Sequence, residues 1–323
     1  MLVVHDAFNS TDLPRGGVAT IGNFDGLHRG QRGVIERVQE RAEALGTSSL
    51  VITFEPHPVA VLRPESTPPR LTTPEQKEKL LEEAGVDVTL VVRFTPEFAR
   101  TTARDFVSGF LCQRLGLAEV HVGASFVFGH QREGDLTLLE EVGGDCGFAA
   151  HAVEPLRWSG ERISSTRIRK ALAEGRVDDA EEMLGRAYSV AGTVARGDRM
   201  GQKIGWPTIN VAPGSEEQLI PLSGVYATRV HLPSYPATFD SVTNIGTRPT
   251  VYENYRRVVE SHVLDFNADV YGERVAVSFY RRLREEKIFP TVMDLSAQIG
   301  RDVEATREYF ATRRRLEEQI LQP

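Results

Sequence analysis

The stretch that most constrains the fold runs from Val18 to Gln31 and reads V-A-T-I-G-N-F-D-G-L-H-R-G-Q. Its apolar start, 18–21, predicts a strand, and Gly22 and Gly26 predict a tight turn. A helical apolar stripe follows, made of Val34, Ile35, Val38, Ala42 and Leu45. A strand, a glycine turn and a helix in this order aim backbone N–H groups at an anion such as a phosphate. The glycines fit equally well a plain strand-to-helix connection that carries a surface histidine, His28.

The residues around these glycines are more specific. G-N-F-D-G-L-H-R-G-Q resembles the nucleotidyltransferase signature that opens bacterial bifunctional riboflavin kinase/FAD synthetases. In that family the turn is followed by H-x-G-H, whose two histidines contact the ATP phosphates. This chain keeps the first as His28 and has Gln31 in place of the second; glutamine donates hydrogen bonds but carries no charge. The resemblance implies that His28 acts in adenylyl transfer. The ATP contacts that it implies here are Gly22, Asn23, Asp25, Gly26, His28 and Gln31.

The composition is that of a globular chain with about two domains. The sequence has 323 residues, of which 41% are hydrophobic and 26% charged. The formal net charge of −7 argues against a general binder of nucleic acid or anionic membranes. Cys112 and Cys146 lie far apart without C-x-x-C spacing, so we expect reduced thiols in a cytoplasmic protein. We see neither a secretory leader nor a run as long as a membrane span, and we expect a monomer or weak homo-oligomer.

Strands and helices alternate through the first half of the chain. Apolar strands are predicted at 49–54, 86–92 and 119–122, and helices between Thr73 and Gly85 and from Thr102 onward. Repeated strand–helix–strand units with apolar strands predict a Rossmann-like parallel sheet covered on both faces. The ligand crevice of such a sheet lies at the carboxyl ends of its strands. The opening turn and the segment 122–129 both fall at such ends.

A second candidate phosphate segment is I-S-S-T-R-I-R, at 163–169. Its hydroxyl residues are good helix caps, so an ordinary helix start also explains them. Two arginines add guanidinium groups at the same helix N-terminus, which suits a polyphosphate. The segment resembles the family's I-S-S-T-x-I-R, which closes over the ATP phosphates. This implies ATP contacts from Ser164, Ser165, Thr166, Arg167 and Arg169.

The periodicity changes after about Tyr188. One long helical pattern stands at 292–320, after a series of short segments that alternate with a period of two residues. Those predicted strands are 189–195, 224–230, 239–244, 258–264 and 275–280. Together these elements predict a small antiparallel β-barrel with a terminal helix. We therefore expect a nucleotidyltransferase domain at 1–185 and a second domain at 186–323.

Two segments of the second domain carry candidate chemistry. The first, 197–210, reads G-D-R-M-G-Q-K-I-G-W-P-T-I-N; its glycine spacing is not that of a Walker A loop, and a mobile hairpin flap also explains it. Within it Thr208 and Asn210 are two residues apart on an extended segment, so their oxygens share a side and suit Mg²⁺ carrying a nucleotide. The second, V-V-E-S-H-V-L-D-F at 258–266, offers Glu260 as a general base, although an isolated strand glutamate is more often simply solvated.

The order of these segments resembles the riboflavin kinase module along almost its whole length. G-x-P-T-x-N is followed by G-V-Y-A at 224–227, N-I-G-T-R-P-T at 244–250, Glu260 and L-R-x-E at 283–286. The resemblance implies phosphorylation of the ribityl hydroxyl of riboflavin by ATP, with Glu260 accepting the proton. It also implies Mg²⁺ on Thr208 and Asn210, and flavin contacts from Arg248 and Arg284. The flap implied to cover ATP contains Gly197, Gly201, Lys203 and Gly205.

By the same resemblance, the first domain joins FMN to the adenylyl group of a second ATP, giving FAD and pyrophosphate. The family's G-x-N-F-x-F-G reads G-A-S-F-V-F-G here, so Ser125 stands at an implied flavin position and Val127 where a polar residue is common. We expect adenylylation to survive, slowed at most, because the other phosphate-binding parts are intact. A monofunctional riboflavin kinase with an impaired first domain is the nearest alternative. A flavin sensor without turnover, or transfer of CMP to another phosphate substrate, fits less of the chain.

Overall fold

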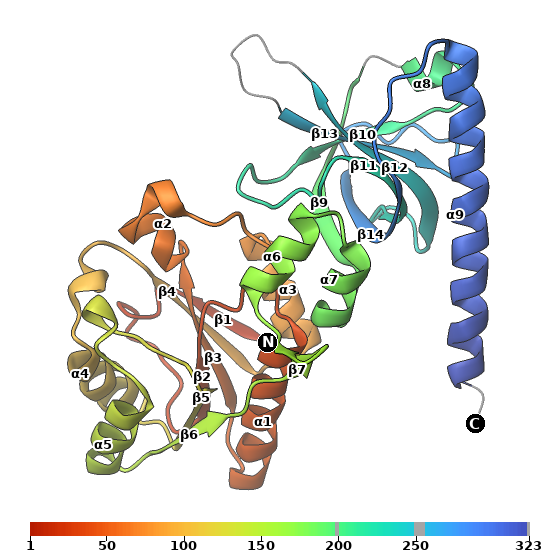
Figure 1. Ribbon diagram of the computed structural model, residues 1–323. Helices are drawn as coiled ribbons and strands as arrows, with labels where there is room; N and C mark the ends of the chain where they lie inside the picture. Colours follow the sequence, from red (N-terminus) through yellow and green to blue (C-terminus); the bar gives the residue numbers. More distant parts are fainter. Residues whose placement is uncertain (198–199, 249–255, 322–323) are drawn as a thin grey trace. The chain divides into compact units, whose positions relative to one another are not determined.

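The computed structural model describes residues 1–197, 200–248 and 256–321 of the chain (Figure 1). Two compact units make up the chain, residues 1–165 and 166–323. Helix α7 (Val177–Leu184) and all but the first residue of α6 (Ser165–Ala173) therefore group with the second unit. The domain boundary at 185/186 stays a prediction.

The first unit contains a six-stranded, wholly parallel sheet in the order β1-β4-β3-β2-β5-β6 (Figure 1). This confirms the predicted parallel sheet. The strands are β1 (Leu2–His5), β2 (Val18–Ile21), β3 (Ser49–Glu55), β4 (Val88–Arg93), β5 (Glu119–Gly123) and β6 (Ala149–Val153). The central strand β2 is buried along its whole length, as a strand covered on both faces must be.

Helices cover both faces of this sheet. On one face, α1 (Arg29–Leu45) and α3 (Pro74–Glu83) pack through Ile35 and Leu81 in a cluster with Val51. On the other, the π-helical segment η3 (Phe106–Arg114) and α5 (Leu136–Cys146) pack against Leu50 and Ile52. Leu45, which we predicted on the buried stripe of α1, is 48% exposed because the helix ends there.

Short elements complete the first unit. Thr73 caps α3 and forms the predicted capping box with Gln76. The remaining elements are α2 (Pro58–Leu62), η1 (Pro64–Ser66), η2 (Phe98–Arg100), α4 (Ala103–Asp105), η4 (His130–Arg132), β7 (Arg157–Trp158) and β8 (Glu161–Arg162).

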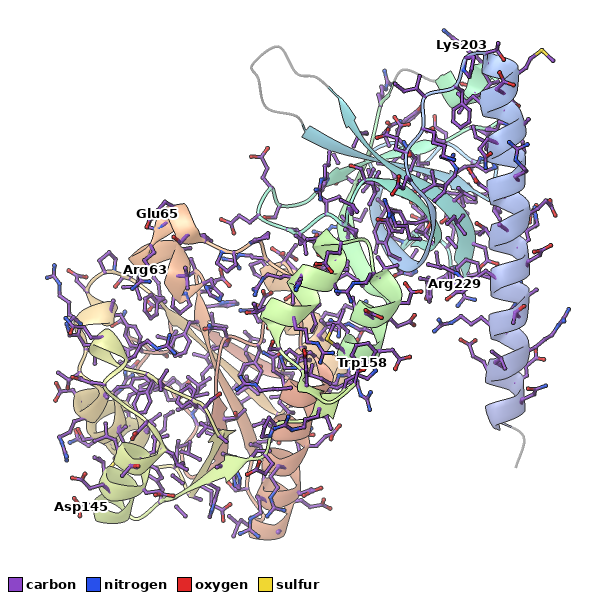
Figure 2. The ribbon with its side chains drawn as sticks, viewed as in Figure 1. Arg63, Glu65, Asp145, Trp158, Lys203 and Arg229 are labelled. Atoms are coloured by element: carbon purple, nitrogen blue, oxygen red, sulfur yellow. A yellow bond between two sulfur atoms is a disulfide. The ribbon has the colours of Figure 1, made fainter. Side chains whose placement is uncertain are left out.

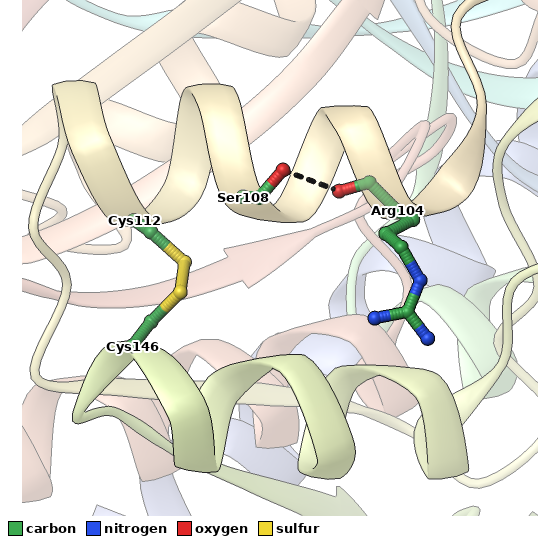
Figure 3. Close-up of a disulfide and its surroundings, with 4 residues drawn as sticks. All are labelled: Arg104, Ser108, Cys112 and Cys146. Atoms are coloured by element: carbon green, nitrogen blue, oxygen red, sulfur yellow. Dashed lines mark hydrogen bonds between the residues drawn. A yellow bond between two sulfur atoms is a disulfide. The ribbon is translucent and has the colours of Figure 1, made fainter.

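The two cysteines form a disulfide, so the prediction of reduced thiols is wrong (Figure 3). Cys112 lies near the end of η3 and Cys146 is the last residue of α5. These neighbouring segments bring the two Cα atoms to 5.7 Å, a separation that a disulfide spans. The sequence separation of 34 residues gave no sign of this contact.

The second unit is built on a closed six-stranded barrel in the order β10-β13-β12-β11-β14-β9. This confirms the predicted antiparallel barrel. Its strands are β9 (Tyr188–Ala195), β10 (Ile209–Pro213), β11 (Gly224–His231), β12 (Thr238–Arg248), β13 (Arg256–Val263) and β14 (Arg274–Arg284). A short helix, α8 (Met200–Lys203), precedes β10. The buried side of the strands includes a row of hydrogen-bonded hydroxyls, Thr228, Ser241, Thr243 and Ser261.

The terminal helix α9 (Val292–Leu321) packs along the barrel, as the sequence predicted (Figures 1 and 2). Val303 of α9 joins a buried cluster with Val225 and Val242. Arg229, labelled in Figure 2, lies with its guanidinium 4.6 Å from the ring centroid of Phe310. Among the described residues, no helix is both long enough and apolar enough to span a membrane.

Candidate active sites

The turn that follows β2 has the form that the sequence predicted, at the carboxyl end of a central strand. Its backbone enters the left-handed region three times, with φ of 48° at Phe24, 88° at Gly26 and 37° at Leu27. Glycine adopts this conformation freely, whereas Phe24 and Leu27 do so at a cost in strain. Both side chains are buried in the cluster beneath α1, and this packing holds the turn in place. Strain of this kind concentrates at functional sites.

His28 and Gln31 are joined at the start of α1. The His28 Nδ1 atom accepts a hydrogen bond from the Gln31 backbone N–H at 3.2 Å. The Gln31 Oε1 atom accepts one from the His28 backbone N–H at 3.1 Å. Because Nδ1 accepts, the proton of the neutral ring sits on Nε2. Gln31 therefore serves as the capping-box partner of His28, a role that the sequence comparison with H-x-G-H did not suggest.

Asp25 ties this turn to the loop before α3. Its buried carboxylate accepts hydrogen bonds from the backbone N–H groups of Leu71 at 3.0 Å and Thr72 at 3.1 Å. The Asp25 backbone oxygen accepts a bond from the Ser165 hydroxyl at 2.8 Å. The two phosphate-facing segments predicted from distant parts of the sequence thus meet at Ser165. Thr166, Arg167 and Arg169 follow on α6, in the second compact unit.

A buried amine behind the turn was missed by the sequence analysis. Lys77 Nζ lies 3.4 Å from the backbone oxygen of Asn23 and 3.4 Å from Glu55 Oε2. Burial lowers the pKa of Lys77, and the Glu55 carboxylate opposes that shift. Burial would raise the pKa of Glu55, but hydrogen bonds from Arg70 and the charge of Lys77 lower it overall. A cavity of about 280 Å³, partly lined by Thr53, Glu55 and Lys77, opens beside this group.

An aromatic cluster lies at the same end of the sheet, where β3, β4 and the segment after β5 end. Ring centroids are 5.9 Å apart for Phe54 and Phe94, and 6.0 Å apart for Phe98 and Phe106. The rings of Phe126 and Phe128 stack at 5.3 Å in the segment that holds Ser125. Ser125 itself is exposed and accepts a hydrogen bond from Arg162. Phenylalanines spread over 54–128 share no short motif, which is why the sequence analysis did not gather them.

In the second unit, Glu260 stands in a row of polar residues across three strands. Its register partner on β10 is Asn210, and its partner on β12 is Asn244. Directly opposed residues of antiparallel strands project from the same face, so the carboxylate lies between two amides. All three residues are partly exposed, on the face opposite to the buried hydroxyl row. The structure thus brings together Asn210 and Glu260, which were named separately from the sequence, and adds Asn244.

The predicted flap glycines lie against the predicted metal ligands. A Cβ atom on Gly197 would come within 2.2 Å of Asn210 Nδ2. One on Gly201 would come within 2.2 Å of the Trp206 backbone oxygen and 3.3 Å of Thr208 Oγ1. Only glycine therefore allows the flap to approach this closely. Lys203 is exposed at the end of α8 (Figure 2), and Gly205 has a φ of 83°.

The arginines predicted to contact flavin have different surroundings. The Arg284 guanidinium donates to both carboxylate oxygens of Asp302 on α9, with Nη2–Oδ2 at 2.8 Å. Arg248 is the last residue of β12; its side chain, like Pro249 and Thr250 of the same motif, lies outside the described residues. Glu286 of L-R-x-E lies near the polar row, since a Cβ on Gly246 would be 2.6 Å from its Oε1 and 3.3 Å from Asn244 Nδ2.

A third polar cluster lies on β5 and β6, at one edge of the parallel sheet. Potential ligand atoms of Glu119, His121 and His151 lie within 4.8 Å of one another. Both oxygens of Glu119, however, accept hydrogen bonds from Arg41, at 3.0 and 2.5 Å, and His121 Nε2 lies 2.8 Å from Oε2. The Arg41 hydrogen bonds lower the pKa of Glu119 to about 2, and burial lowers the pKa of His121. We interpret this cluster as a structural ion-pair network.

The fold and the two polar sites define a two-unit protein with a separate candidate nucleotide site in each unit. Residues 10–167 match the family model for FAD synthetase, and residues 184–310 match the model for riboflavin kinase. The bifunctional riboflavin kinase/FMN adenylyltransferases of Escherichia coli K12 and Pseudomonas fluorescens are each 39% identical over 311 residues, covering 96% of this chain and 98% of theirs. The chain belongs to the bifunctional riboflavin kinase/FMN adenylyltransferase family.

A solved structure has the same architecture. The crystal structure of a protein from Streptococcus pneumoniae, described as a macrolide-efflux protein, superposes with a TM-score of 0.86 at 26% identity. It matches 95% of this chain and 98% of its own. Both units of this chain therefore have counterparts in that structure.

Proposed function

We propose that the chain makes FAD from riboflavin in two ATP-dependent steps. The second unit transfers a phosphoryl group from ATP to the ribityl hydroxyl of riboflavin, giving FMN. The first unit transfers the adenylyl group of a second ATP to FMN and releases pyrophosphate. The observation that carries this proposal is the coexistence, in one chain, of the Asn210–Glu260–Asn244 row and the His28 turn, each within its matching family domain.

In the kinase reaction, Glu260 takes the proton of the attacking hydroxyl. Its place between Asn210 and Asn244 in the strand register supports this role, because it sets the carboxylate among polar side chains on one face of the barrel. The Thr208 hydroxyl and the Asn210 amide oxygen are hard ligands that fit Mg²⁺. When bound, Mg²⁺ would neutralise charge on the ATP phosphates. The glycines at 197, 201 and 205, with Lys203, cover the nucleotide.

In the adenylyl transfer, the FMN phosphate is already an anion and needs no base. The enzyme has to stabilise charge that develops on the leaving pyrophosphate. The N-terminus of α1 and the Nε2–H side of His28 supply donors for this charge. Gly22 and Gly26 allow close backbone approach, while Asp25 and Ser165 fix the turn. Arg167 and Arg169 are proposed to reach the phosphates from α6.

The phenylalanine cluster at the end of the parallel sheet supplies an apolar surface for the flavin ring of FMN. Flat aromatic ligands stack favourably on such side chains. Ser125 lies beside this cluster, and its exposed hydroxyl is available for a polar flavin contact. Arg248 and Arg284 remain proposed flavin contacts of the kinase site, with Arg284 already oriented by Asp302.

We further propose a cytoplasmic enzyme that is a monomer or a weak homo-oligomer and acts without nucleic acid or membrane. The net charge of −7 supports this. The Cys112–Cys146 disulfide is a feature that cytosolic proteins seldom keep. Alkylation of cysteines in rapidly quenched cells would show whether the two thiols are reduced, as a cytoplasmic location predicts, or joined.

A single incubation tests the function. Purified protein is mixed with riboflavin, Mg²⁺ and excess ATP, and riboflavin, FMN and FAD are resolved over time. We expect FMN to rise first and FAD to follow. FMN without FAD would favour the monofunctional kinase, and riboflavin bound but unchanged would favour a flavin sensor.

A further inference from the structure

His262 lies in the kinase site but has no part in the reaction described above. It is two residues beyond Glu260 on β13, so both side chains project from the same face of the strand. Its Nδ1 atom lies 2.7 Å from the backbone oxygen of Pro207. A carbonyl oxygen only accepts hydrogen bonds, so Nδ1 carries a proton and donates it. This contact joins β13 to the residue immediately before Thr208.

The ring of His262 is also held from the side. The Trp206 ring meets it edge-on, with centroids 5.3 Å apart and an interplanar angle of 89°. Trp206 Nε1 donates a hydrogen bond to Ser296 Oγ on α9 at 2.9 Å. Trp206 further packs against the apolar cluster that includes Val303. The dipeptide 206–207 is therefore fixed between the strand of the proposed base and the terminal helix.

The position of this dipeptide determines where the proposed metal ligands lie. Pro207 leads directly into Thr208, and Asn210 is already aligned with Glu260 by strand pairing. Thr208 lies immediately before the first residue of β10, at the very end of the paired segment. The hydrogen bond from His262 to Pro207 holds the backbone on the other side of Thr208.

We propose that His262 is a positioning residue for riboflavin phosphorylation, which holds Thr208 in place relative to Glu260 through its Nδ1–H bond to the Pro207 oxygen. This inference rests on the proposed function of the second unit. A displacement of about 1 Å in such a group lowers catalysis by about 10²-fold. The loss should appear in kcat/KM for Mg-ATP, because Thr208 serves the nucleotide and not the flavin.

The test compares two substitutions of similar size. His262→Asn keeps an N–H donor near the place of Nδ1, whereas His262→Leu has none. We expect His262→Leu to lower kinase kcat/KM for Mg-ATP by about 10- to 100-fold, with the KM for riboflavin little changed. We expect His262→Asn to stay within about threefold of wild type. Conversion of FMN to FAD by the same preparations is the control for the first unit, and thermal unfolding of each variant, compared with wild type, is the control for folding of the second unit.

Several outcomes would overturn the inference. Equal loss of kinase activity in both variants would indicate that His262 acts by proton transfer or by contacts of its ring. Full activity of His262→Leu would show that the hydrogen bond to the Pro207 oxygen is dispensable. If His262→Leu unfolds, His262→Phe, which keeps an aromatic ring against Trp206 but has no donor for the Pro207 oxygen, replaces it with the same expected loss; an unchanged rate then contradicts the proposal. A wild-type protein that makes no FMN would instead refute the proposed function.

Discussion

At the scale of single residues, Gln31 shows how a substitution at a chemical position is accommodated. It forms the capping box with His28, so it orients the ring that we propose to face the ATP phosphates. The charge of a second histidine is lost, but the alignment of the first is kept. This is the physical basis for our expectation that adenylylation survives.

The substitution Gln31→Glu separates these two roles. Glutamate is a good capping-box partner, and its negative charge is favourable at a helix N-terminus. The free energy of unfolding should therefore be unchanged or higher by about 0.3–1 kcal/mol. The same charge repels the ATP phosphates, so we expect FAD formation from FMN to fall at least about tenfold. The kinase rate of the same sample is the control. Wild-type adenylylation in Gln31→Glu would show that position 31 is remote from the phosphates.

Glu119 makes stability depend on pH. Its pKa is about 2 in the folded chain and 4.5 ordinarily, so its ion pair stabilises the fold above about pH 4.5 and is lost as the pH falls toward 2. The lowered pKa of His121 acts in the same direction, since the unfolded chain takes up that proton more readily below about pH 6.5.

We expect Glu119→Gln to lower the free energy of unfolding at pH 7 by about 1–3 kcal/mol, because Arg41 loses its charged partner. Urea unfolding of wild type and variant, repeated from pH 7 to pH 3, measures this. The difference should narrow below about pH 4.5. A difference that stays constant down to pH 3 would contradict the assignment.

At the scale of elements, the flap before β10 depends on glycine. A Cβ on Gly201 would meet the Trp206 oxygen at 2.2 Å, so Gly201→Ala must displace the flap or Thr208. We expect a loss of about 10²-fold in kinase kcat/KM with adenylylation unchanged. Gly214→Ala is the matched control, because its nearest neighbour would be the Ala191 oxygen at 3.7 Å. Equal kinase activity of the two variants would show that the flap takes no part in the kinase reaction.

The disulfide joins two elements of the first unit. It closes a loop of 34 residues, for which chain entropy gives a stabilisation of about 3–4 kcal/mol. Cys112→Ser with Cys146→Ser should lower the unfolding free energy of that unit by about this amount. The unfolding transition of the barrel, followed by Trp206 fluorescence in a Trp158→Phe background, should stay at the same denaturant concentration. If the unfolding transition of the first unit does not change in the double variant, the disulfide does not stabilise that unit.

Elements with strong local patterns could be predicted from sequence, and those defined by tertiary contact could not. The buried strands β2, β3 and β4 and the capped helix α3 were found because apolar runs and capping residues are local signals. The short edge strand β1 was not predicted: its apolar run is only three residues long (L-V-V), and the strand is exposed at both ends and half-buried between them. β10 is recognisable only once it pairs with β9 and β13.

The candidate sites divide in the same way. Residues within one motif, such as His28 and Glu260, were named from sequence. Asn244 enters the kinase site through strand register, Lys77 reaches the turn from α3, and the two cysteines meet through helix packing. Tertiary contacts of this kind produce no recognisable spacing of residues in the sequence.

At the scale of the whole molecule, two consecutive reactions belong to two compact units of one chain. The product of the kinase, FMN, is the substrate of the adenylyltransferase. We propose a separate catalytic group for each site, so loss of one activity should leave the other working.

The most direct test of this division is the substitution Glu260→Gln, assayed once with riboflavin and once with FMN as the starting flavin. Glutamine preserves the size of the side chain but cannot accept the proton. We expect formation of FMN from riboflavin to fall by about 10²- to 10⁴-fold, while FMN is converted to FAD at the wild-type rate. Rapid phosphorylation of riboflavin by the variant, or loss of FAD formation from supplied FMN, would contradict two independent sites with Glu260 as the kinase base.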